Sequence, residues 1–321
     1  MHVYLTIDTE ISAGLFQMLG KDASREIFDR SITGRTPTGD VGVGYQMDVF
    51  ERNGLKGVFF VDPMPALVMG ESIIRDIVEP IVERGHDVQL HMHTEWLAFA
   101  KDSPVEGRVG SNIKDFSLED QVALIGYAAG ALVNAGASQP VAFRAGNYGA
   151  SDNTLHALAL HGIKYDTSFC PGIAQSHCSI SLSKNITEAV EHCGVVEVPI
   201  GAIKARGEKR RHAQITALSS YEMINALNHS EKIGRNSYSI VSHSFEMMAR
   251  DRYSINQVVR RRFERFCHDL SLQPRFVSGT YAHSPPEVAE IYSLGLLPHN
   301  VIDTLFRMGE QAFSNFLYGS K

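Results

Sequence analysis

The sequence predicts an α/β protein in which strands and helices alternate around a largely parallel sheet. Short apolar runs of β-favouring residues are separated along the chain by segments with helical periodicity. Most of these runs end in polar residues suited to catalysis, as strands do when their carboxyl ends form a site. A chain of 321 residues without internal repeats or a clear linker is routine for one α/β barrel, so we expect a single domain over 1–321.

The elements of the first half follow from their residue patterns. Apolar runs predict strands at 3–8, 57–62, 85–93 and 140–144. Amphipathic periodicity predicts helices at 45–52, 73–84 and 117–134, the second of them kinked at Pro80. Residues 11–44 are polar and glycine-rich, and we expect a loop there with one short helix at 16–19.

The second half continues the alternation. Strands are expected at 163–166, 195–200 and 238–244, and helices at 152–161, 219–233, 255–270 and 304–318. The pattern of residues 170–194 favours no element. The last helix is amphipathic and lies in a C-terminal extension, 300–321, which we expect to pack on the barrel.

Two strand ends carry paired polar residues. The first strand runs into Asp8-Thr9-Glu10, and the strand at 85–93 ends in His91-Met92-His93. Residues i and i+2 of a strand point to the same side, so each pair presents two side chains to one place. Two histidines and one carboxylate make an open three-ligand metal site, and a second carboxylate beside it can act as a base. A hydrogen-bonded histidine pair at a strand end is the alternative for His91 and His93.

Composition narrows the function classes. With 30 basic and 36 acidic residues the net charge is −6, which argues against a nucleic-acid partner because phosphate binding needs a basic face. Four cysteines without CxxC spacing imply no disulfide framework. The first strand starts within two residues of Met1, which leaves no room for a signal peptide, and no apolar run is long enough to span a bilayer. We therefore expect a cytoplasmic protein without an integral membrane segment.

Five short segments resemble the motifs of a known family, in the family's order. They are residues 5–8, 85–93, 143–149, 166–168 and 241–244. The resemblance is to the polysaccharide deacetylases, carbohydrate esterase family 4, with the chitooligosaccharide deacetylase-like fold, and it covers residues 2 to about 270. It implies a distorted, incomplete (β/α) barrel. It also implies an enzyme that removes N- or O-acetyl groups from sugars with a divalent metal, usually zinc.

The sequence departs from the usual family pattern at two positions. Thr9 stands where the family has a second aspartate, and Glu95 stands where it has the second histidine of its H-x-x-x-H motif. Variant branches, some associated with lipopolysaccharide biosynthesis, resemble this chain in their D-x-E and H-x-H patterns. By this resemblance Asp8 is the catalytic base, although Asp8 and Glu10 could exchange roles. The implied metal ligands are Glu10, His91 and His93.

The resemblance also implies roles for residues outside the metal set. Arg144 would pair with the base and hold it ionised, and the alternative is a structural ion pair. His243 would be the general acid, oriented by Asp166, unless it merely ends its strand. Backbone N–H groups near Tyr148 would stabilise the oxyanion. Trp96, the only tryptophan, either stacks on a sugar ring or packs in the core.

Three functions remain open at this stage. The first is a metal-dependent hydrolase that removes an acyl group, expected to be N-acetyl, from a sugar during cell-surface polysaccharide or lipopolysaccharide synthesis. Its partner would be a carbohydrate, either a sugar precursor or a glycan. The second is a hydrolase of another small amide, such as a formamide or a cyclic ureide. The third is a sugar-binding relative without catalysis. The sequence indicates no oligomeric state.

Overall fold

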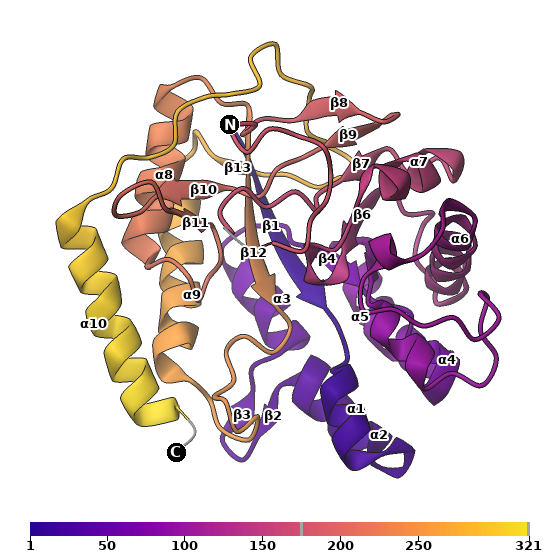
Figure 1. The fold of residues 1–321 in the computed structure, drawn as a ribbon. Helices are drawn as coiled ribbons and strands as arrows, with labels where there is room; N and C mark the ends of the chain where they lie inside the picture. Colours follow the sequence, from indigo (N-terminus) through magenta and orange to yellow (C-terminus); the bar gives the residue numbers. More distant parts are fainter. Residues whose placement is uncertain (174–175, 320–321) are drawn as a thin grey trace.

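A computed structural model describes residues 1–173 and 176–319, and a curved sheet forms the centre of the molecule (Figure 1). Its nine strands follow the order β12-β1-β4-β5-β6-β7-β9-β8, with β13 paired to the start of β1. All its pairs are parallel except β8–β9. The strands are β1 (His2–Thr9), β4 (Val58–Val61), β5 (Asp87–Met92), β6 (Ala142–Ala145), β7 (Tyr165–Asp166), β8 (Val190–His192), β9 (Val195–Glu197), β12 (Ser237–His243) and β13 (Val277–Ser278). The expected α/β class and parallel sheet are confirmed.

Regular strand pairing does not close this sheet into a full barrel. β7 and β9 are only two and three residues long. Beyond them, two isolated parallel bridges lead back to β12, Ile200 to Ser239 and Gln214 to Val241. The strand expected at 195–200 stops at Glu197, two residues before Pro199, which has no N–H to donate to a ladder. The fold is therefore a distorted, incomplete (β/α) barrel, as the family resemblance implied.

Helices surround the sheet and mostly begin where the sequence placed them. The side chain of Ser117 accepts a hydrogen bond from the backbone of Asp120, and Ser219 forms a reciprocal capping box with Glu222. Pro80 lies inside its helix, as expected. The helices are α1 (Ala13–Leu19), α2 (Ser24–Phe28), α3 (Val43–Arg52), α4 (Ala66–Met69), α5 (Ser72–Glu83), α6 (Leu118–Asn134), α7 (Asp152–Leu160), α8 (Ser220–Lys232), α9 (Gln257–Ser271) and α10 (Val301–Tyr318).

Residues 11–44 are more ordered than the loop that the sequence predicted. They form α1, α2, the π-helical turn η2 (Asp29–Thr33) and a hairpin of β2 (Arg35–Thr36) and β3 (Gly39–Asp40). Gly42 permits a close backbone approach here, since a Cβ on it would lie 1.9 Å from the carbonyl oxygen of Ile32. These elements are short and depend on such tertiary contacts, which periodicity along the chain does not reveal.

The C-terminal helix packs on the outer helices and not on the sheet. α10 lies beside α9 at one side of the molecule (Figure 1). Among residues 1–173 and 176–319, no helix combines the length and the apolar character that crossing a membrane requires.

The strand register places the candidate residues of separate motifs next to one another. Asp8 of β1 is paired with His243 of β12, and His91 of β5 is paired with Arg144 of β6. Because the strands are parallel, these residues all lie at the carboxyl ends, where α/β proteins form their sites. The parallel sheet therefore joins five motifs that are far apart in the sequence.

Candidate active site

Three side chains of the expected metal set converge at the carboxyl ends of β1 and β5. One carboxylate oxygen of Glu10, Oε2, lies 3.1 Å from His91 Nε2 and 2.6 Å from His93 Nε2. One ligand atom from each of the three residues lies within 4.8 Å of the others. His91 is buried in β5, whereas His93 follows the strand and is half-buried. The arrangement therefore presents two imidazole nitrogens and a carboxylate to one point, with a side open to solvent.

The outer nitrogen of each histidine has its own acceptor. His91 Nδ1 lies 2.8 Å from the backbone oxygen of Arg144, and His93 Nδ1 lies 2.9 Å from Glu95 Oε2. A carbonyl and a carboxylate only accept, so both Nδ1 atoms carry a hydrogen and both Nε2 atoms point inward. The side chain of Asn147 donates to the other oxygen of Glu95 at 2.9 Å. Glu95, at the position of the family's second histidine, therefore orients His93 from outside.

The charges of this cluster stabilise one another. Burial alone would raise the pKa of Glu10, but His93 and His91 outweigh it and hold that pKa well below its usual range. Burial alone would lower the pKa of His93, yet the carboxylates of Glu10 and Glu95 raise it well above its usual value. The site thus holds an anionic carboxylate and needs positive charge opposite it, which suits a cation as well as an imidazolium.

Asp8 lies between an arginine and a histidine. Arg144 Nη1 donates a hydrogen bond of 2.5 Å to Asp8 Oδ1, and Asp8 Oδ2 is 3.9 Å from His243 Nε2. Arg144 is fully buried, its Nε donates to the backbone oxygen of Thr167 at 3.3 Å, and its guanidinium lies over the ring of Phe60 at 4.4 Å. The guanidinium therefore holds the Asp8 carboxylate in place through one of its two oxygens.

Glu246, which the sequence analysis missed, is the acidic partner of His243. Glu246 Oε2 accepts from the His243 backbone N–H at 2.9 Å and lies 3.7 Å from its Nδ1, while Gln214 Nε2 is 3.3 Å from the same ring nitrogen. Burial would lower the pKa of His243, but Glu246, Asp8 and Glu10 raise it to about 9. Conversely, burial would raise the pKa of Glu246, but His243 lowers it to about 2. An acid three residues after the histidine was the signal available in the sequence.

The expectation that Asp166 orients His243 is wrong. Asp166 accepts hydrogen bonds from the backbone N–H and the hydroxyl of Ser168, at 2.9 and 2.8 Å, and faces Glu197 on the neighbouring strand β9. Burial raises the pKa of both carboxyls; Asp166 raises the pKa of Glu197 further, whereas the hydrogen bond with Glu197 lowers that of Asp166. Asp166 fails as the partner because its carboxylate is bonded to Ser168 and faces Glu197, while Glu246 lies beside the ring of His243.

The two aromatic residues expected to bind substrate differ in position. Trp96 is 0% exposed and its ring packs 5.3 Å from Phe16 and 6.1 Å from Phe99, so stacking on a sugar is wrong and core packing is observed. Two aromatic neighbours from separate segments, the buried Phe16 and the half-buried Phe99, pack against it, and the sequence position of Trp96 did not reveal this contact. Tyr148 is half-buried in the turn after β6, at a φ of 56°. Its backbone therefore lies at the site end of the sheet.

A cavity of about 440 Å³ opens beside Glu95. Its walls come from α1, from the turn η3 (Thr94–Ala98) and from residues 109–111. Because Glu95 contacts His93, this cavity borders the histidine cluster and offers space for part of a substrate.

Comparisons with known proteins show the fold. No protein-family model and no curated protein matches the sequence. A solved structure from Mycobacterium smegmatis, assigned as a polysaccharide deacetylase, superposes with a TM-score of 0.55 at 16% identity over 90% of this chain and 94% of that one. A 4-alpha-glucanotransferase from Thermococcus litoralis gives 0.53 at 11% identity over 100% of this chain and 48% of its own. A family 4 carbohydrate esterase from Streptomyces lividans gives 0.42 at 13% identity over 92% and 97%.

Two of these structures share the fold but carry names of different activities. The chain thus has the fold of the polysaccharide deacetylases, and fold alone does not decide function. The function has to be argued from the residues at the strand ends.

Proposed function

We propose that the protein is a metal-dependent deacetylase of an N-acylated sugar. The observation that carries this proposal is the position of Glu10, His91 and His93 beside the buried Asp8–Arg144 pair. A ligand set, a separate base and a separate acid are what hydrolysis of an amide requires. A non-catalytic sugar-binding relative would need none of this arrangement.

Glu10, His91 and His93 are the proposed ligands of the metal. Their donor set fits a divalent cation such as zinc, and each histidine has the outer acceptor typical of metal-binding imidazoles. When bound, the cation would act as a Lewis acid on the acyl carbonyl and lower the pKa of the attacking water.

Asp8 is the proposed general base. Its Oδ1 is occupied by Arg144, which leaves Oδ2 to accept the proton of the attacking water. Arg144 contacts the base and not the substrate, so it acts by holding the Asp8 carboxylate in place. The backbone near Tyr148 would donate to the developing oxyanion.

His243 is the proposed general acid. Its raised pKa, about 9, keeps it protonated near neutral pH, and its Nε2 faces Asp8 and the reaction side. Glu246 lies beside Nδ1 of His243, and this contact orients the ring so that Nε2 can donate its proton to the leaving amine. The two proton transfers are thus assigned to different residues, Asp8 as the acceptor and His243 as the donor, whose reacting atoms lie 3.9 Å apart.

We infer the substrate class from the family resemblance. The expected substrate is a sugar precursor or glycan of cell-surface polysaccharide or lipopolysaccharide synthesis, and a cytoplasmic location fits this role. The same groups could hydrolyse another small amide, so the released acid identifies the reaction.

The test measures metal and product together. Purified protein is stripped with a chelator, reloaded with zinc, and incubated with N-acetylated sugars while acetate, formate and free amine are measured. We expect activity to disappear on stripping, to return with zinc, and to release acetate and amine in equal amounts. Formate release would replace this proposal with the small-amide alternative, and activity unaffected by stripping would overturn the metal dependence.

A double variant and a matched control locate the metal. His91→Ala with His93→Ala should reduce the bound metal from about one equivalent to none. His192→Ala is the control, because His192 lies with Asp152 and Cys193 in a second cluster of potential ligands away from the proposed site. Metal lost only in the control would assign the ion to that other cluster.

A further inference from the structure

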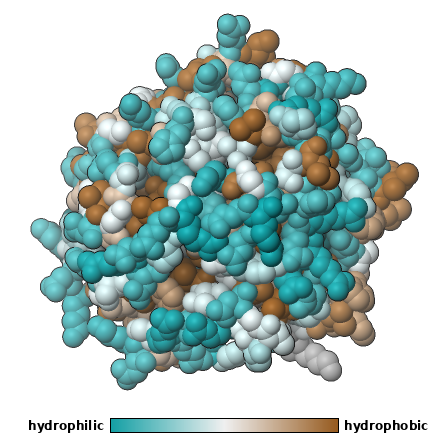
Figure 2. Space-filling view, turned by 180° about the vertical axis from the view of Figure 1, so that it is seen from behind, coloured by the Kyte–Doolittle hydropathy of each residue, from teal (hydrophilic) through white to brown (hydrophobic). Residues whose placement is uncertain are grey.

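The C-terminal helix α10 exposes its apolar side and buries its polar side. At 100° per residue its apolar residues form one continuous face, and they are exposed. Ile302 is 77% and Phe316 is 84% exposed. We call this surface the α10 apolar face, and its main residues are Ile302, Leu305, Phe306, Phe313, Phe316 and Leu317. Figure 2, which shows the molecule from behind, has hydrophobic residues along the edge on which α10 lies.

Polar contacts hold the helix in this orientation. They join Asp303 to Asn225 (3.0 Å), Arg307 to Glu222 (3.1 Å) and Glu310 to Arg262 (2.9 Å). Arg307, Glu222 and Arg262 are buried. Turning the apolar face inward would leave these charges unpaired in the interior, which is strongly unfavourable. The α10 apolar face therefore cannot turn toward the core without breaking these ion pairs. An exposed apolar patch of this kind marks an interaction site.

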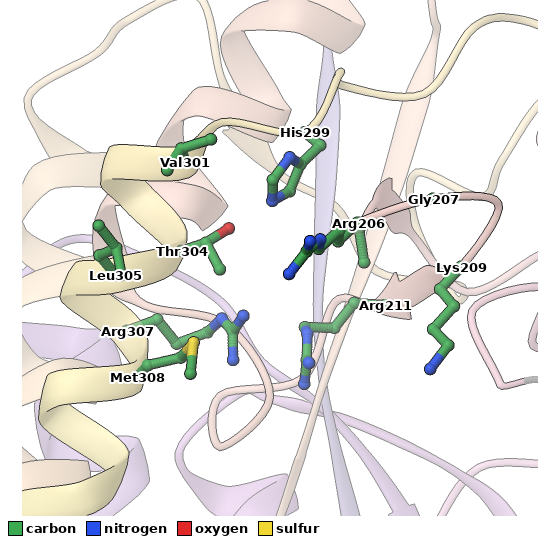
Figure 3. Close-up of a pocket in the computed structure, with 11 residues that line it drawn as sticks. Arg206, Gly207, Lys209, Arg211, His299, Val301, Thr304, Leu305, Arg307 and Met308 are labelled. Carbon is green, nitrogen blue, oxygen red and sulfur yellow. The ribbon is translucent and has the colours of Figure 1, made fainter.

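A cavity of about 1020 Å³ lies between the first half of α10 and the hairpin of β10 (Ala202–Lys204) and β11 (Arg210–His212) (Figure 3). Arg206, Lys209 and Arg211 line it from the hairpin, and none of them forms an ion pair with an acid in the part of the chain that the structure describes. Within the same residues, Arg211 Nε and His299 Nε2 lack a hydrogen-bond partner. Glu208 is the acid of the hairpin loop. The cavity thus offers positive charge to an anion.

We propose that this surface docks the protein onto an anionic lipid bilayer. The α10 apolar face would enter the boundary between headgroups and acyl chains, and the adjoining cavity would receive lipid phosphate. Charge complementarity selects this partner: the chain as a whole carries −6, yet three cations without an acid partner among the described residues, Arg206, Lys209 and Arg211, lie together beside the exposed apolar helix. A second copy of the chain is the other occupant that the apolar face could take, and the oligomeric state in solution distinguishes it from a bilayer.

Sedimentation with lipid vesicles tests the proposal on the full chain. The probes are vesicles of phosphatidylcholine alone and vesicles with about a third of phosphatidylglycerol. We expect at least about ten-fold stronger binding to the anionic vesicles. Phe313→Ser with Phe316→Ser should reduce that binding about ten-fold or more, because two exposed rings that would enter the bilayer are lost. Arg206→Glu with Lys209→Glu should reduce it by about five-fold or more for each residue.

The control variants carry changes of the same kind at exposed residues elsewhere. Leu160→Ser alters an exposed residue at the end of α7, and Lys56→Glu with Lys164→Glu reverses two exposed charges in loops that precede strands. Both should bind anionic vesicles like the unaltered protein, and circular dichroism should show all variants folded. Absent binding, equal binding to both vesicle types, or equal losses in the controls would overturn the proposal. A dimer in solution that only Phe313→Ser with Phe316→Ser dissociates would overturn it in favour of self-association.

Discussion

Two groups of carboxylates lie at the same end of the sheet and differ in what faces them. Asp8 and Glu10 face cationic partners, Arg144 for the first and two histidines for the second. Asp166 and Glu197 face each other on adjacent strands. The pKa of Glu10 is accordingly held well below its usual range, whereas burial and mutual repulsion raise the pKa of Glu197 well above it.

The difference separates carboxylates suited to chemistry from carboxyls suited to structure. An ionised acid next to positive charge can accept a proton or bind a metal. A buried, protonated acid beside another acid donates a hydrogen bond and stays out of acid–base work. On this basis we propose that the reaction takes place at the ends of β1, β5 and β12 and not at β7 and β9.

The largest effect should come from exchanging the two acids of the first group for amides. Asp8→Asn should reduce turnover about 10²–10⁴-fold while metal stays bound, because the base is lost. Glu10→Gln should lose metal instead, because an amide is a poorer ligand. Turnover and metal content are measured on both variants, and the opposite pattern would exchange the roles of Asp8 and Glu10.

The next effect concerns the proton donor. His243→Ala should slow hydrolysis of a sugar amide about 10²–10⁴-fold, but slow hydrolysis of an activated acetate ester far less. An amine must be protonated to leave, whereas a phenolate need not be. Rates on the two substrates are compared in both proteins. Equal losses on both would show that His243 serves oxyanion stabilisation or folding and not proton donation.

A smaller effect should follow from neutralising Glu246. The raised pKa of His243 predicts that activity falls as pH rises through about 9, since the acid is then deprotonated. Glu246→Gln removes the largest attraction for that proton, so the alkaline limb of the pH–rate profile should move to lower pH. Glu264→Gln, on α9, should leave the limb in place. An unmoved limb in Glu246→Gln would assign it to another group.

The smallest effect should come from changing Glu197 in the second group of carboxylates, and it should alter the stability of the fold and not the activity. The folded-state pKa of Glu197 lies above its unfolded value, so the stability that its protonated form contributes is present at low pH and is lost as pH rises. Glu197→Gln cannot ionise, and should gain thermal stability relative to the unaltered protein between about pH 5 and about pH 8. A melting temperature difference independent of pH would contradict the buried, protonated state of Glu197.

Most of the correct predictions about the fold and the site rest on patterns among residues that are close together in the sequence. The periodicity of α6 and the continuous apolar runs of β1 and β5 are local patterns, and the structure has these elements within a few residues of the expected bounds. The i, i+2 spacing also placed His91 and His93 on one side of their strand end. The same reasoning failed for residues 11–44, where short elements depend on packing.

Pattern along the chain thus determined which elements form and which strand ends carry chemical groups, because side-chain direction in a strand repeats every two residues. Tertiary structure alone decided the partners. His243 contacts Glu246 and not Asp166, Trp96 is enclosed by rings from two segments, and α10 turns its apolar side outward. Each of these arrangements depends on the order of strands in the sheet or on contacts between distant segments. The spacing of residues along the chain predicts neither the strand order nor such contacts.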